Sequence, residues 1–143
     1  MNIELLRAQL EREEGRRAVA YADTLGIWTI GVGHTGPEVH EGLVWTAEQI
    51  DRAFAIDMDE AIAGIEARLP WAVKLDDARL GALANMAFQM GVSGLLGFPR
   101  MLTALKAGRW QEAHDQALDS KWAKQTPARA QRVAEQLRTG EWR

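Results

Sequence analysis

The stretch that decides the fold reads Glu14-Gly15-Arg16-Arg17-Ala18-Val19-Ala20-Tyr21-Ala22-Asp23-Thr24-Leu25-Gly26-Ile27-Trp28-Thr29-Ile30-Gly31-Val32-Gly33-His34. It holds one carboxylate, Glu14, directly before a glycine, and a second, Asp23, nine positions later in a turn. Two acids held on different elements can take different protonation states at one pH, which is what cleavage of a glycosidic bond requires. We therefore take this stretch as the candidate site and the rest of the chain as its frame.

A short amphipathic helix is predicted directly before this stretch. Apolar residues recur at helical spacing among charged ones over residues 3–14, and Gly15 is a typical helix-ending residue. The negative end of a helix dipole disfavours the charged form of a carboxylate, which favours a proton-donating acid there. Glu13 is the alternative donor, since it is the neighbouring carboxylate. The two side chains lie about 100° apart around the helix.

A β-hairpin is predicted after Gly15. Residues 18–21 and 27–33 are rich in aromatic and β-branched side chains, and they flank the turn Asp23-Thr24-Leu25-Gly26. In the second strand, alternation places Thr29 on the face opposite Trp28 and Ile30. The glycines on the Thr29 side leave room for a close approach.

The remainder of the chain predicts helices. Residues 35–45 form a loop, and Thr46 with Gln49 matches a capping box that opens a long helix ending before Pro70. Further helices are expected from Asp76 or Asp77 to Met90, around 95–107, over 110–118, and from a Thr126 cap with Pro127 at the first helical position through 137.

Composition narrows the class of protein. The chain has 143 residues, 47% of them apolar, so it can form one domain with a real core, and it has no cysteine. The charged amino terminus and the lack of a long apolar run predict a soluble protein without signal or anchor. Residues 121–143 carry a net charge of +4 within a total of −3; solvated helix faces are a commoner explanation than binding of an anionic polymer.

Seven motifs occur in order along almost the whole chain: Glu14-Gly15, Tyr21-x-Asp23-Thr24-x-Gly26, Thr29-Ile30-Gly31-Val32-Gly33-His34, Asn85-Met86-Ala87-Phe88-Gln89-Met90-Gly91, Gly97-Phe98, Arg109-Trp110 and Trp122-x-x-Gln125-Thr126-Pro127-x-Arg129-Ala130-x-Arg132-Val133. Together they resemble the motifs of the phage-type lysozymes, glycoside hydrolase family 24.

The resemblance implies an α+β, mainly helical, two-lobed lysozyme-like fold in a single domain, residues 1–143. A hairpin-containing amino-terminal lobe would span about 13–45, a connecting helix 46–69, and a helical carboxyl-terminal lobe 70–143, with the first helix packing on that last lobe.

The implied activity is that of a bacteriolytic muramidase, which hydrolyses the β-1,4 bond between N-acetylmuramic acid and N-acetylglucosamine in peptidoglycan. The family's catalytic residues fall on Glu14, Asp23 and Thr29, which selects Glu14 over Glu13. Glu14 would be the general acid, Asp23 would activate water or support the transition state, and Thr29 would hold the water, a layout that suits inversion.

The resemblance also suggests substrate-binding residues in the larger lobe. Phe88 and Gln89 match cleft positions, and Arg129 and Arg132 lie three residues apart on one helix, where they would meet the peptide carboxylates of the wall or pair with local acids.

Other family positions differ here or have another role. Thr35, Met101 and Gln116 stand where relatives carry a leucine, a saccharide-contacting serine and an asparagine. His34 is expected to form a structural ion pair with Asp57.

We expect no cofactor, no metal, no nucleic acid and a monomer. The expected biology is that of an endolysin in the cytoplasm of a phage-infected bacterium, which reaches the periplasmic wall through a separate membrane-permeabilising protein. The alternatives are a lytic transglycosylase acting on the same bond and a catalytically inactive wall-binding module.

Overall fold

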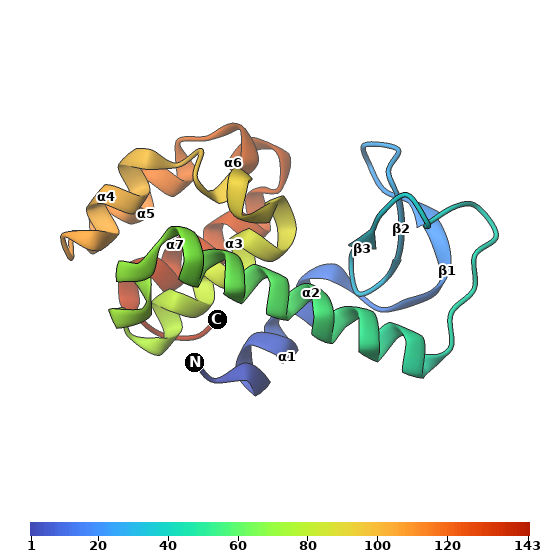
Figure 1. Cartoon of the computed structure of the whole chain (residues 1–143). Helices are drawn as coiled ribbons and strands as arrows, with labels where there is room; N and C mark the ends of the chain where they lie inside the picture. Colours follow the sequence, from blue (N-terminus) through green and yellow to red (C-terminus); the bar gives the residue numbers. More distant parts are fainter. The chain divides into compact units, whose positions relative to one another are not determined.

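The computed structural model describes all 143 residues and contains seven α-helices, one 3-10 helix and three short strands (Figure 1). The predicted α+β, mainly helical class is confirmed. The elements are α1 (Ile3–Glu14), β1 (Arg17–Ala22), β2 (Trp28–Gly31), β3 (His34–Thr35), α2 (Ala47–Arg68), η1 (Pro70–Lys74), α3 (Asp77–Leu95), α4 (Pro99–Lys106), α5 (Trp110–Leu118), α6 (Lys121–Gln125) and α7 (Pro127–Thr139).

The chain divides into two compact units. The first, the helical unit, comprises Met1–Leu6 and Ala61–Arg143, and the second, the sheet unit, comprises Arg7–Glu60. Helices α1 and α2 each contribute residues to both units. All residues of the opening stretch, 14–34, belong to the sheet unit.

The sheet is antiparallel with the order β1-β2-β3. Thr29 in the central strand pairs with Tyr21 of β1 on one side and with Thr35 of β3 on the other. The third strand was not predicted, since residues 35–45 were expected to be a loop; two residues are too few to show alternation.

Strand β1 pairs with two segments, β2 and residues 43–45. Its register against β2 shifts between Arg17, which pairs with Gly31, and Tyr21. Between these points the backbone of β1 turns to the segment 43–45, where Val19 bridges Val44 and the Trp45 N–H donates to the Ala18 carbonyl at 2.8 Å. This double pairing encloses a small core made of Ala20, Ile30 and Val39, with Trp28, Leu43 and Trp45 packed against it.

The capping box of α2 is confirmed. The Thr46 N–H donates to Gln49 Oε1 at 2.8 Å, and the Gln49 N–H donates to Thr46 Oγ1 at 3.2 Å, so two amino-terminal donors are satisfied reciprocally. Buried side chains then recur every three or four residues along the helix, which gives it one apolar stripe.

Helix α3 is the buried centre of the helical unit. Every residue from Ala78 to Ala87 is buried except Leu80, and the helix packs against α7. Its cap is Asp76, whose Oδ2 accepts from the Arg79 N–H at 3.1 Å. The predicted end at Gly91 coincides with a break, because this residue has φ 75° and ψ 162°, after which one more turn continues to Leu95.

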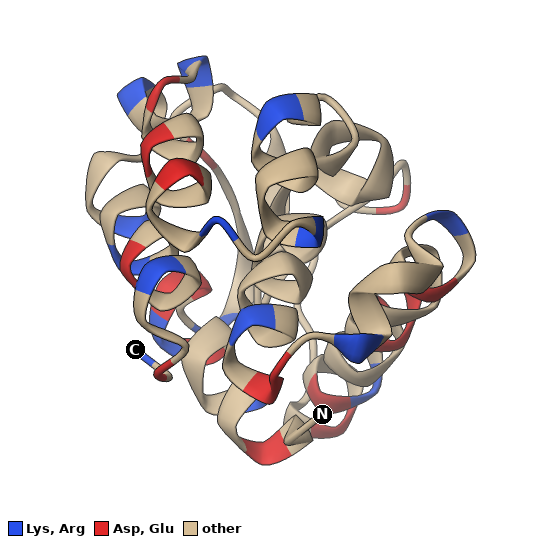
Figure 2. Ribbon diagram, turned by 90° about the vertical axis from the view of Figure 1, so that its left-hand side faces the viewer, with Lys and Arg blue, Asp and Glu red and all other residues tan.

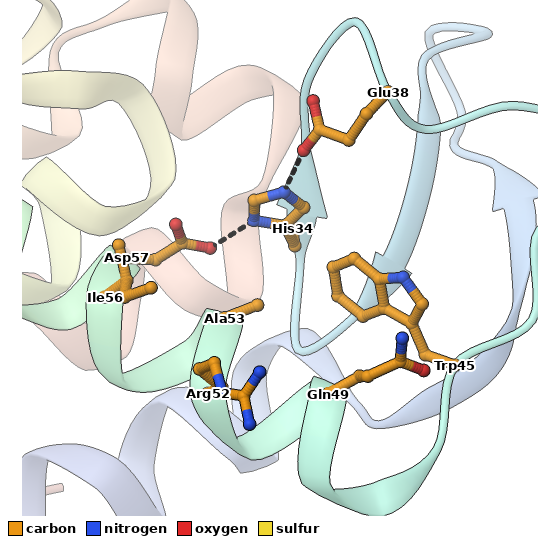
Figure 3. A pocket seen from close by; sticks show the side chains of 8 residues that line it. All are labelled: His34, Glu38, Trp45, Gln49, Arg52, Ala53, Ile56 and Asp57. Atoms are coloured by element: carbon orange, nitrogen blue, oxygen red, sulfur yellow. Dashed lines mark hydrogen bonds and ion pairs between the residues drawn. The ribbon is translucent and has the colours of Figure 1, made fainter.

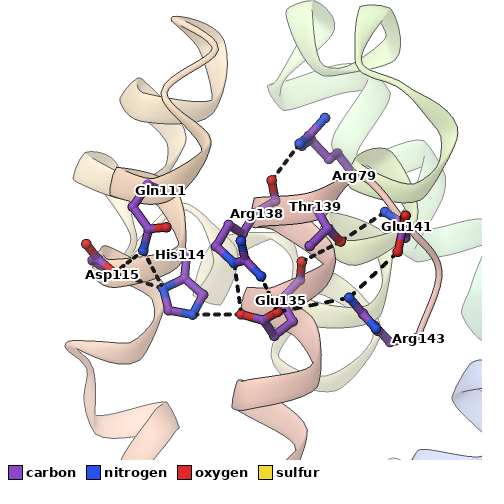
Figure 4. A network of polar contacts seen from close by, with 9 residues as sticks. All are labelled: Arg79, Gln111, His114, Asp115, Glu135, Arg138, Thr139, Glu141 and Arg143. Carbon is purple, nitrogen blue, oxygen red and sulfur yellow. Dashed lines mark hydrogen bonds and ion pairs between the residues drawn. The ribbon is translucent and has the colours of Figure 1, made fainter.

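A buried arginine fastens the end of α7. The Arg79 guanidinium donates to the Arg138 carbonyl at 2.8 Å (Figure 4). It also donates to the Leu137 carbonyl at 2.7 Å, pairs with Asp76, and lies 3.8 Å from the centre of the Trp110 ring. These carbonyls belong to the last turn of α7, where no further helical N–H is available to them.

The predicted start of α7 is confirmed, with Thr126 at the cap position and Pro127 at the first helical position, but the predicted capping bond of the Thr126 hydroxyl is wrong. The hydroxyl donates back to the Trp122 carbonyl at 3.1 Å and makes no bond to α7. The reason is the short helix α6, which was not predicted: it begins at the Ser120 cap, and Thr126 lies both at the end of α6 and at the start of α7.

Two of the six basic residues in the carboxyl-terminal segment 121–143 pair with the two acids of the same segment. Arg138 pairs with Glu135 at 2.7 Å and Arg143 approaches Glu141 at 3.8 Å (Figure 4). In Figure 2, Lys and Arg segments are interspersed with Asp and Glu segments along the helices. This arrangement favours charged helix faces in solvent over a surface for an anionic polymer.

By length and apolar composition, no individual helix qualifies as a membrane span; only α3 and α4 taken together do so, and they are bent by 114°.

Candidate active site

Glu14 lies at the carboxyl end of α1, and its carboxyl group sits directly on the backbone of Gly33. Gly15, with φ 73°, ends the helix at this point. A Cβ atom on Gly33 would overlap Glu14 Oε2 and lie only 2.7 Å from Glu14 Cδ. Gly33 also has φ 63°, so only glycine meets both demands of this position. The glycines were predicted to leave room for another group to approach the strand closely, and at Gly33 that group is the Glu14 carboxyl.

Asp23 organises the hairpin turn. Its Oδ1 accepts from the N–H groups of Leu25 and Ile27, both at 2.8 Å, and its own N–H donates to the Ile27 carbonyl. Both side-chain bonds go to one oxygen, so Oδ2 is left for another partner. The carboxyl group is half-buried and is fixed in place by the turn that it forms.

Thr29 is the most enclosed of the three predicted catalytic residues. It is 4% exposed, and its hydroxyl donates to the Ile27 carbonyl at 3.0 Å. Because the proton is used in this bond, the oxygen can still accept a hydrogen bond from another group. Alternation along β2 places Thr29 on the face opposite the core residue Ile30.

Tyr21 and Arg17 join this face; neither was predicted as a site residue, although Tyr21 stands in the turn motif. Tyr21 is the cross-strand partner of Thr29, so the two side chains lie on the same side of the sheet. The pKa of Tyr21 is raised, first by burial and then by the charge of Glu14, with a smaller contribution from Asp23 and an opposing one from Arg17. The Arg17 guanidinium lies over the Tyr21 ring at 4.7 Å. The available signal was an aromatic residue two positions before Asp23 on the predicted strand.

His34 is held between two carboxylates beside a hollow of about 280 Å³ (Figure 3). Its Nδ1 lies 2.6 Å from Asp57 Oδ2, as the ion-pair prediction requires, and its Nε2 lies 2.6 Å from Glu38 Oε1, a partner that was not predicted. Burial lowers the pKa of His34, but the hydrogen bonds with Glu38 and Asp57 outweigh burial and raise it. Trp45 packs at 5.2 Å from the imidazole.

The predicted substrate-binding residues all lie in the helical unit, and they differ in exposure. Gln89 Oε1 accepts from the Trp122 indole N–H at 2.8 Å, and Phe88 is half-buried. Arg132 is exposed, whereas Arg129 is only 7% exposed and its Nε donates to Asn85 Oδ1 at 3.0 Å. The burial of Arg129 weighs against a direct contact with a wall peptide.

The three positions that depart from the family pattern fall in different surroundings. Met101 is 1% exposed, so it is a core residue in this protein and not part of a sugar subsite. Gln116 is half-buried on α5, and Thr35 is exposed on β3. No group of three or more His, Asp or Glu side chains is arranged to hold a metal ion.

Comparison with known proteins identifies the family of this chain. The phage lysozyme family model matches residues 11–139. The chain is 36% identical to the endolysin of Salmonella phage P22 over 83% of this chain and 82% of the relative, and 29% identical to a probable T4-type lysozyme of Dictyostelium discoideum over 94% of each. It is 35% identical to the pre-baseplate central spike protein Gp5 of Enterobacteria phage T4 over 92% of this chain, and it spans about a quarter, 27%, of that relative. The chain belongs to the phage lysozyme family and is a lysozyme-type hydrolase.

Proposed function

We propose that this lysozyme is an inverting muramidase of glycoside hydrolase family 24, which cleaves the β-1,4 bond between N-acetylmuramic acid and N-acetylglucosamine in peptidoglycan. The observation that carries the proposal is the placement of the Glu14 carboxyl group on Gly33, within one three-stranded sheet unit that also contains Asp23 and Thr29.

Glu14 acts as the general acid and donates its proton to the leaving oxygen. Two glycines fix its position: α1 ends at Gly15, directly after Glu14, and Gly33 has no side chain, so the Glu14 carboxyl group can lie against its backbone. A fixed position within hydrogen-bond reach of the leaving oxygen is the first requirement of a general acid.

Asp23 and Thr29 act together on the attacking water. The Asp23 Oδ2 atom, which takes no part in the turn, accepts a proton from the water as it attacks. The Thr29 oxygen, whose own proton is directed to Ile27, accepts the water's other hydrogen bond. An inverting mechanism needs this water on the sugar face opposite the acid.

The proposal extends to binding and biology. Among the residues of the helical unit, Phe88, Gln89 and Arg132 bind the substrate directly, and Arg129 contributes indirectly through its hydrogen bond to Asn85. The name endolysin of the P22 relative supports a role in host-cell lysis. We infer a monomer that accumulates in the host cytoplasm and reaches the wall after a separate protein permeabilises the membrane.

The test is a lysis assay on permeabilised Gram-negative cells with the wild type and Glu14→Gln. The variant should clear cells at a rate indistinguishable from buffer while its circular dichroism spectrum and unfolding midpoint stay unchanged. If the wild type does not clear the cells, the enzymatic role is refuted and a wall-binding module is favoured.

The products distinguish the possible reactions. Proton NMR early in the reaction should show the inverted α-anomer at the new reducing end, and a retained β-anomer would refute inversion. Mass spectrometry should show the hydrated mass; a 1,6-anhydro end would identify a lytic transglycosylase instead.

A further inference from the structure

Two consecutive arginines, Arg16 just before β1 and Arg17 at its first position, have opposite surroundings. Arg16 is engaged by acids and backbone: it lies 2.8 Å from Asp51 and 3.7 Å from Glu11, and it donates to the Ala47 carbonyl at 3.4 Å. Arg17 is exposed and forms no ion pair, and its contact is with the ring of Tyr21. The guanidinium of Arg17 is therefore available to a ligand, whereas that of Arg16 is not.

The stacking on Tyr21 holds this available cation in one place. A guanidinium held over an aromatic face keeps its N–H groups available to another partner, and it loses less rotational freedom on binding than a mobile side chain does. The Tyr21 platform is itself fixed by pairing with Thr29 in the central strand. Such a guanidinium is suited to receive a carboxylate through two parallel hydrogen bonds.

The neighbouring charges show why a cation is needed on this face. Tyr21 is close enough to Glu14 and Asp23 for both carboxylates to raise its pKa. The ionised Asp23, which accepts a proton from water in the proposed function, would repel an anionic substrate group that approached this face. Arg17, whose charge lowers the pKa of the same tyrosine, supplies the compensating positive charge.

We propose that Arg17, stacked on Tyr21, is a carboxylate-binding subsite that recognises the acidic groups carried by the muramoyl units of the glycan strand. This inference rests on the proposed function for the identity of the ligand, since muramoyl units carry a lactyl group and peptides with carboxylates, whereas a chitin strand carries none. The subsite makes Arg17 a specificity-determining residue, and it leaves the chemical step to the acids.

The experiment measures binding without turnover. In a Glu14→Gln background, two matched ligands are titrated by NMR: a peptide-bearing tetrasaccharide of the wall, and the same molecule with its carboxylates converted to methyl amides. We expect the carboxylate form to bind roughly 10- to 100-fold more tightly, the range for charge-assisted hydrogen bonds, with the Arg17 Nε–H resonance shifting on titration.

Variants assign the preference to the stacked guanidinium. Arg17→Ala should erase it, Arg17→Lys should keep a smaller part because an ammonium lacks the planar fork, and Tyr21→Leu should weaken it by removing the platform. Arg52→Ala is the matched control, because Arg52 is also exposed, lies in the same unit and has no aromatic stack or ion pair. Equal affinity of the wild-type site for both ligands, or an undiminished preference in Arg17→Ala, would overturn the proposal.

Kinetics separate this subsite from the proposed function. On peptide-bearing wall fragments, Arg17→Ala should raise KM by roughly 10-fold or more with kcat unchanged. A wild-type protein that hydrolyses the wall with the same KM as Arg17→Ala would remove the subsite and leave the muramidase role intact. A wild-type protein that hydrolyses nothing but still prefers the carboxylate ligand would remove the muramidase role and leave the subsite.

Discussion

Replacement of Gly33 by alanine should disable the protein while leaving it folded. Two effects add at this position. An L-residue at φ 63° costs roughly 1–2 kcal/mol of stability. The new methyl group would lie 2.7 Å from Glu14 Cδ, so the carboxyl carbon must retreat by about 0.7 Å to reach the 3.4 Å of ordinary van der Waals contact. The oxygen that overlaps the methyl group must move further.

The second effect sets the expected loss of activity. A displacement of a catalytic group by about 1 Å can reduce the rate roughly 100-fold. Gly42→Ala is the control, because Gly42 also has a positive φ of 89°, but a Cβ there meets nothing within 4 Å. Both variants should lose a similar 1–2 kcal/mol in urea unfolding, and only Gly33→Ala should lose wall hydrolysis.

The comparison can refute the reasoning in either direction. If Gly33→Ala hydrolyses wall fragments as fast as Gly42→Ala does, the contact between the Glu14 carboxyl group and Gly33 has no part in catalysis. If Gly42→Ala is as inactive as Gly33→Ala, the loss reflects backbone strain in the sheet unit and not the position of the carboxyl group.

Three further perturbations test the frame of the site. The pKa of His34 is raised in the folded protein. Protonated His34 therefore stabilises the fold fully below the unfolded pKa of about 6.5, and this stabilisation is lost as the pH rises through the higher folded pKa. The difference in urea midpoint between the wild type and His34→Asn should shrink as the pH is raised through this range, and a constant difference would contradict the prediction. Arg79→Ala should lower the free energy of unfolding by roughly 3–5 kcal/mol, because two carbonyls of the last turn of α7 lose their donors; a loss under about 1 kcal/mol in calorimetry would show that water replaces the side chain. Thr46→Ala should lower the free energy of unfolding by about 1 kcal/mol through the lost cap of α2, and the control is Thr103→Ala at an exposed position of α4.

Much of the fold could be predicted because its signals are local. The Thr46 and Gln49 pair is a short-range pattern whose two hydrogen bonds need no distant partner. The helix predicted over 110–118 has the same bounds in the structure. By contrast, β3 has only two residues and exists through pairing with β2, so nothing within its own sequence could reveal it. The position of Thr126 at the start of α7 was predicted correctly, but its hydroxyl had two possible backbone partners and bonds to the Trp122 carbonyl of α6.

The candidate site was only partly accessible from sequence. The resemblance to phage lysozymes supplied Glu14, Asp23 and Thr29, and alternation placed Thr29 away from the apolar core. The contact between Glu14 and Gly33 is tertiary, as is the second carboxylate on His34, so neither could be read from spacing. Burial also could not be read from residue type: an arginine at position 129 suggested an exposed charge but is 7% exposed.

The divided pairing of β1 has a consequence for behaviour at high concentration. The sheet unit exposes several large apolar side chains, including Val19 at 54% and Val44 at 63%, and an open strand edge beside them would be a template for intermolecular pairing. That edge is not open, because the backbone of β1 is hydrogen-bonded to the segment 43–45. The opposite edge, β3, is two residues long. The sheet therefore offers little length on which a second chain could add a strand, which protects against aggregation.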